Sequence, residues 1–105
     1  MRGGLYLRVR VRVAKVDGHC PVFSEGDEFL FEDFFIKRGH ECDICIHALN
    51  AISHFLWALT HGHSPKEIGI GKGAKGYLKC PDPGPPITKG GSVLFELSLE
   101  DDLLQ

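Results

Sequence analysis

Four cysteines are the residues of this chain whose types and spacing point most clearly to chemistry. Two form the motif Cys42-Asp43-Ile44-Cys45, whose two-residue spacer lets two thiolates converge on one ion. Cys20 and Cys80 each precede a proline in a turn-like segment, a common setting for a site-forming loop. Together the four could supply the sulfurs of a tetrahedral zinc site or of an iron–sulfur cluster.

We expect Cys20, Cys45 and Cys80 to be the metal ligands, with Cys42 or His47 as the fourth. Zinc is favoured over an iron–sulfur cluster because nothing in the sequence demands redox chemistry. The alternative is a metal-free ligand-binding or oligomeric module whose thiols simply fill space, since unpaired cysteine is among the most buried residue types. A thioredoxin-type redox pair is a third interpretation, but its motif should follow a strand, and a polar turn precedes this one.

The other chemical patterns are weaker. The loop from Gly69 to Gly76 contains the spacing GxGxxG, but it follows a helix instead of a strand, so it does not fit a dinucleotide site. Four histidines recur every seven residues (His40, His47, His54 and His61), and neighbours in that row are about 10.5 Å apart along a helix, too far to share one ion. No serine or cysteine hydrolase triad is recognisable.

Alternation of apolar and polar residues predicts three or four strands. In the first, over residues 5–13, the apolar side chains occupy one face and Arg8, Arg10 and Arg12 occupy the other. Further strands are expected over 28–34, 77–80 and 93–99. If the last strand lies beside the first, its glutamates at 96 and 100 face the arginine row. This pairing explains the arginines without a nucleic-acid ligand.

One helix is expected from Asp43, a suitable N-terminal cap, to about Thr60. Apolar residues recur along it at helical spacing, and Gly62 suits a left-handed cap at its C-terminal end. The chain is therefore predicted to be one α+β domain over residues 1–105. We expect a small, mostly antiparallel sheet of three or four strands with one covering helix.

Three blocks of the chain resemble an uncharacterised family of small bacterial and archaeal proteins. They are Cys20-Pro21-Val22-Phe23 with the following Glu25-Gly26-Asp27-Glu28-Phe29, Cys45 opening the helix, and Cys80-Pro81-Asp82-Pro83 before the last strand. The resemblance implies that Cys20, Cys45 and Cys80 are the family's cysteines and that Cys42 is peculiar to this chain. The chain departs from the family at Ile46-His47 and at Lys79. The family implies a fold and a site, but no reaction.

Composition limits the classes of partner. The 105 residues carry a formal net charge of −2, whereas a dedicated nucleic-acid binder needs a basic excess. No apolar run approaches the roughly 20 residues that cross a bilayer, and the N-terminal residues lack the apolar block of a signal peptide. We therefore expect a cytoplasmic protein. An open strand edge in so small a sheet also predicts a homodimer.

Overall fold

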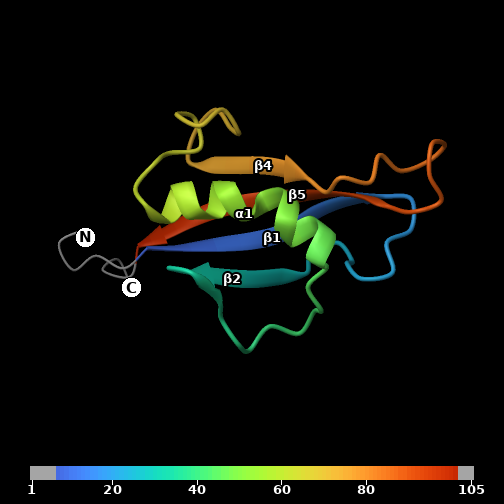
Figure 1. The fold of residues 1–105 in the computed structure, drawn as a ribbon, viewed down its shortest axis with the longest axis horizontal. Coiled ribbons are helices and arrows are strands. Elements are labelled where there is room, and N and C mark those ends of the chain that lie inside the picture. Colours follow the sequence, from blue (N-terminus) through green and yellow to red (C-terminus); the bar gives the residue numbers. More distant parts are fainter. Residues whose placement is uncertain (1–6, 102–105) are drawn as a thin grey trace.

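The computed structural model describes residues 7–101 as a five-stranded antiparallel sheet with one helix across it (Figure 1). The elements are β1 (Leu7–Asp17), β2 (Glu28–Glu32), β3 (Phe35–Ile36), α1 (Ile46–Thr60), β4 (Lys75–Lys79) and β5 (Ser92–Asp101), and the strand order is β3-β2-β1-β5-β4. The predicted α+β class is confirmed. The sheet has five strands, one or two more than the three or four predicted.

The two longest strands, β1 and β5, form the centre of the sheet. They pair from Leu7↔Asp101 to Asp17↔Ser92, as predicted for the terminal strands, with a bulge between Val13 and Lys15. Alternate residues of each strand turn toward the helix because side chains change face at every residue. The resulting core lies between the sheet and α1. It consists of side chains from β1, β5 and α1, together with Phe23 from the loop after β1 and Phe29 from β2 (Val9, Val11, Val13, Phe23, Phe29, Ala48, Ile52, Leu56, Leu59, Val93, Phe95 and Leu97).

The strand expected over residues 28–34 is shorter than predicted, and a turn at its last two residues leads into the extra strand of the sheet, β3. β2 ends at Glu32, the chain turns at Asp33 and Phe34, and β3 returns along β2 with Phe31 opposite Ile36. Asp33 has a φ of 51°, a left-handed conformation that aspartate tolerates better than most residues. The strand prediction was therefore wrong at this point because an Asp-Phe turn lacks the glycine that usually marks a hairpin.

Helix α1 begins two residues later than predicted. Cys45 is its N-cap residue, with φ −74° and ψ 128°, so the expected cap at Asp43 is wrong. The predicted end at Thr60 is confirmed, and Gly62 has the left-handed φ of 98° expected after a helix C-terminus. The apolar stripe is also confirmed, since the buried helical side chains lie at Ala48, Ile52, Leu56 and Leu59. No helix within residues 7–101 is long and apolar enough to cross a membrane.

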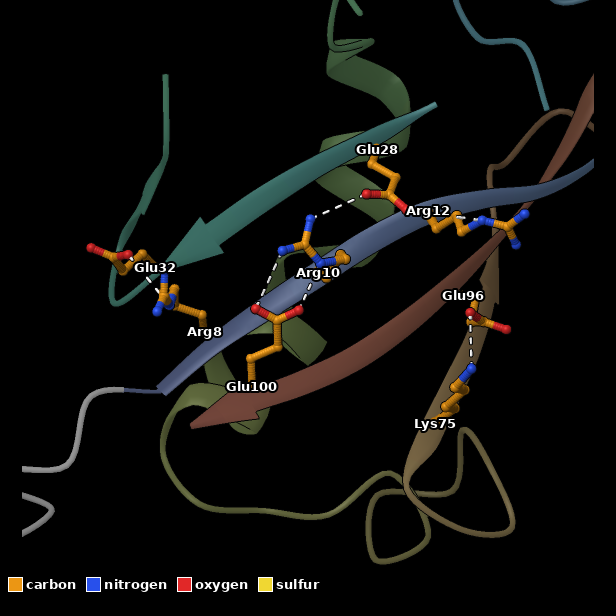
Figure 2. Close-up of polar contacts among 8 residues, drawn as sticks. All are labelled: Arg8, Arg10, Arg12, Glu28, Glu32, Lys75, Glu96 and Glu100. Carbon is orange, nitrogen blue, oxygen red and sulfur yellow. Dashed lines mark hydrogen bonds and ion pairs between the residues drawn. The ribbon is translucent and has the colours of Figure 1, made fainter. Parts of the chain in front are cut away.

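The arginine row lies among acidic side chains on the sheet face away from α1. Arg10 donates from Nε to Glu100 Oε2 at 2.6 Å and from Nη1 to Glu28 Oε1 at 3.1 Å (Figure 2). Hydrogen bonding to Glu100 raises the pKa of Arg10. The predicted Arg–Glu pairing between β1 and β5 is thus confirmed at Glu100.

The same face contains pairs that the sequence did not predict. Arg8 Nε lies 3.8 Å from Glu32 Oε1, and Arg12 Nε lies 4.0 Å from Glu28 Oε2, so β2 supplies acidic partners as well (Figure 2). Glu96 is opposite Arg12 in register, yet its carboxylate pairs with Lys75 at 3.5 Å. The ionic network therefore extends over β2, β1, β5 and β4.

Candidate functional site

Three cysteines from distant parts of the chain line one pocket of about 440 Å³. Cys20 follows β1, Cys45 precedes α1, and Cys80 follows β4. The turn after β1, the start of α1 and the loop before β5 all gather at one end of the molecule, away from the described ends of the chain (Figure 1). Cys20, Cys45 and Cys80 thus lie around one pocket at one end of the domain, without the close convergence of sulfurs predicted for a bound ion.

Cys20 is held by a turn that is anchored in the core. The backbone N–H of Phe23 donates to Cys20 Sγ at 3.3 Å. The Phe23 ring is almost completely buried and meets the Phe95 ring edge to face, with a centroid distance of 5.3 Å. The position of the Cys20 sulfur consequently depends on how Phe23 packs.

Cys80 is tied to the beginning of β5 by its backbone and its sulfur. Its N–H donates to the Val93 carbonyl at 3.0 Å, and the Val93 N–H donates to Cys80 Sγ at 3.3 Å. The Cys80 thiol lies 3.7 Å from the Gly91 carbonyl, which can accept its proton. As a thiol, Cys80 can therefore donate to the Gly91 carbonyl. As a negatively charged metal ligand, its sulfur would still be stabilised by the Val93 N–H.

Gly91, in the loop between β4 and β5, lies directly against the Cys20 turn. A Cβ added to Gly91 would lie 2.7 Å from the Cys20 nitrogen and 2.7 Å from the His19 carbonyl carbon. Such contacts are closer than real Cβ atoms make, so the two segments can approach only because this residue has no side chain.

Gly91→Ala is therefore expected to destabilise the protein by about 1–3 kcal/mol, because backbone atoms of the Cys20 turn would have to move. Chemical denaturation measures the loss. Gly73→Ala is the matched control, since a Cβ at Gly73 would meet no described atom within 4 Å. Equal midpoints for the two variants would show that the Cys20 turn does not pack against Gly91.

Asp82 orders the loop that closes the pocket. Its Oδ1 accepts hydrogen bonds from the Thr88 hydroxyl and, at 2.9 Å, from the Gly84 N–H. These two donors, Thr88 first, lower the pKa of Asp82. Both Asp82 and Thr88 line the pocket beside the cysteines.

A lowered pKa means that the Asp82 carboxylate stabilises the fold above the ordinary aspartate pKa of about 3.9. This contribution should be lost as the pH falls through the lower pKa of the folded state. In Asp82→Asn the denaturation midpoint should therefore fall less as the pH is lowered than it does in the wild type. Denaturation of both proteins at a series of pH values measures this difference. Asp43→Asn, a change at an exposed residue outside the loop, is the control. An unchanged pH profile in Asp82→Asn would contradict this role.

Cys42 and His47, the two candidates for the fourth ligand, are separated by the fold. His47 lines the pocket with the three cysteines. Cys42 is absent from the lining residues, and its thiol donates instead to the Glu28 carbonyl at 3.6 Å. Burial, followed by the charges of Asp27 and Asp43, raises the pKa of Cys42. The two cysteines of the CxxC motif therefore do not converge on this pocket.

The pocket does not have the spacing of a formed metal centre. Within residues 7–101, no three His, Cys, Asp or Glu side chains lie close enough together to hold one ion. All four cysteines are free thiols. The sequence predicted the sulfurs and His47 as site residues. Asp82 lies within the block Cys80-Pro81-Asp82-Pro83 but had no predicted role, and Thr88 and Gly91 belong to no motif.

Comparisons of the chain with protein-family models, with curated proteins and with solved structures give no match. The geometry of the pocket is therefore the basis for the functional argument.

Proposed function

We propose that the protein binds a thiophilic metal ion, zinc in the first instance, through Cys20, Cys45 and Cys80. The observation that supports this function is the position of three cysteines from three separate segments around one pocket. Thiolates are preferred ligands of zinc and of iron–sulfur clusters, so the donor set fits either group in its chemistry. A bound ion would add stability to a domain whose core is small.

The surroundings of each sulfur favour this chemistry. Cys45 lies at the N-terminus of α1, where unpaired N–H groups carry partial positive charge and stabilise a thiolate. The sulfurs of Cys20 and Cys80 each accept a backbone N–H. His47 is better placed than Cys42 to be the fourth ligand because it lines the same pocket.

Metal binding requires the three sulfurs to come closer together than they are in this arrangement. Sulfurs on one zinc lie within about 4 Å of one another, given bonds of about 2.3 Å. Cys20 and Cys80 lie in loops outside the strands and Cys45 caps α1, so the sulfurs would approach one another through small shifts that keep the hydrogen bonds from Phe23 and Val93.

Elemental analysis of protein purified without oxygen, combined with a visible spectrum, tests the proposal. We expect one zinc per chain and no colour. A brown protein with stoichiometric iron would instead assign the pocket to an iron–sulfur cluster. Protein that retains neither metal, and that takes up neither on reconstitution, would contradict metal binding.

A second candidate is a metal-free pocket for a small apolar molecule. The spacing of the sulfurs favours it, and the volume of about 440 Å³ lies within the range of small-molecule sites. An apolar fluorescent probe separates the two functions. If zinc is absent, the probe should bind this pocket, and Val22→Trp, which adds bulk at a half-buried lining residue, should abolish that binding. If zinc occupies the pocket, the probe should bind only after a chelator has removed the zinc.

Assembly as a homodimer in the cytoplasm and membership of the Cys-Pro family also remain proposals. A homodimer would form by pairing of an open sheet edge, but part of that edge is already occupied. The N–H of Tyr77 in edge strand β4 already donates to the Ile70 carbonyl at 2.8 Å. The opposite edge strand, β3, has only two residues. The mass of the protein in solution decides the oligomeric state.

A further inference from the structure

A second hollow, of about 350 Å³, lies at the other end of α1 from the cysteines. It is lined by Asp33 and Phe34 from the β2–β3 turn and by Trp57 and His61 from the end of α1. Phe34 is 85% exposed and Trp57 is 58% exposed, although aromatic side chains of this size usually bury most of their surface. Two large exposed rings around one hollow suggest that they serve a ligand.

The aromatic wall on the helix is held in place. His61 stacks on Trp57 with a centroid distance of 4.1 Å and an interplanar angle of 25°. His61 Nδ1 lies 2.7 Å from the Trp57 carbonyl oxygen, which can only accept, so Nδ1 carries the proton of this hydrogen bond. On the opposite wall, the Phe34 ring packs edge to face against Phe35, with a centroid distance of 5.4 Å.

The charges around the hollow favour a cation. Aromatic faces are negative, and the C-terminal end of a helix carries about half a negative charge. Among the residues that the structure describes, the lining contains no lysine or arginine. An anion would meet no fixed positive charge from these four residues unless His61 were protonated.

We propose that this hollow binds a methylated ammonium group, with Phe34 and Trp57 as the aromatic walls. A quaternary ammonium matches this environment because its charge is spread over methyl groups that contact aromatic faces with little loss of hydration. The site is independent of the cysteine pocket, so zinc binding and ammonium binding can succeed or fail separately.

Trp57 is the only tryptophan, so intrinsic fluorescence reports directly on the hollow. Choline chloride is titrated at constant ionic strength, with 3,3-dimethylbutanol as the uncharged isostere. We expect a saturable change with choline and about two- to fivefold weaker binding of the alcohol, the contribution of an exposed cation–π contact. No saturable change, or equal binding of the alcohol, would overturn the proposal.

Phe34→Ala should weaken choline binding by about 2- to 30-fold. The exposure of Phe34 means that the variant should still fold, and the denaturation midpoint checks this. Ile87→Ala, which removes an equally exposed apolar side chain elsewhere, is the control and should bind choline as the wild type does. Equal choline affinities of the wild type, Phe34→Ala and Ile87→Ala would also overturn the proposal. A peptide carrying trimethyllysine, titrated in parallel, shows whether the site prefers a free ligand or a modified protein.

Discussion

Replacing Phe23 by alanine is expected to lower the free energy of unfolding by about 3–5 kcal/mol. The ring is almost fully buried and packs against both Phe29 and Phe95. Removing it would leave a cavity between the Cys20 turn and the centre of the sheet. A domain of this size is stable by roughly 5–15 kcal/mol in total, so the variant should lose a large fraction of its stability.

Urea denaturation followed by circular dichroism measures this loss. Ile87→Ala serves as the control, because Ile87 is 77% exposed and its replacement should change stability by no more than about 0.5 kcal/mol. A loss below about 1 kcal/mol for Phe23→Ala would show that the Cys20 turn is not anchored in the core. The position of the Cys20 sulfur would then be unexplained.

The second large effect is expected at the cysteine pocket. Cys45→Ser should weaken zinc binding by at least about 100-fold, since even the loss of a group that only orients a ligand costs about 10- to 100-fold. Serine has nearly the same shape but a hydroxyl that remains protonated, so the change removes a ligand with little effect on packing. Competition with a chromophoric chelator measures the affinity.

Cys42→Ser is the matched control for this experiment. It changes the same chemical group in the same motif, but at a residue whose thiol points to the Glu28 carbonyl and not to the pocket. Zinc affinity should therefore stay close to that of the wild type. Equal losses in Cys42→Ser and Cys45→Ser would mean that the CxxC motif binds the ion as a pair.

The parts of the fold that could be predicted from the sequence are those with long, regular patterns. The alternation in β1 and β5 defined their buried faces, and the opposite charges on their other faces predicted that they pair. The β2–β3 turn could not be predicted because phenylalanines recur on both sides of Asp33, a composition that is typical of a continuous strand. The helix N-terminus was misplaced because Asp43 has the right residue type for a cap two residues too early.

Of the residues in the candidate site, the cysteines are the ones whose grouping was predicted from the sequence. Cys20, Cys45 and Cys80 were expected together because each lies where a strand or helix begins or ends, and such ends meet at one side of a two-layer fold. The close approach at Gly91 depends on segments far apart in the sequence, which local patterns do not report. The separation of Cys42 from Cys45 depends on the direction of each side chain at the start of the helix, which spacing alone does not determine.

Residue-by-residue alkylation, with and without one equivalent of zinc, tests most directly whether Cys20, Cys45 and Cys80 form one site. Mass spectrometry follows the labelling of each of the four cysteines over time. We predict that zinc slows labelling at Cys20, Cys45 and Cys80 together and leaves the rate at Cys42 unchanged. Zinc that protects none of the three, or that protects Cys42 and Cys45 while Cys20 and Cys80 stay reactive, would contradict the account.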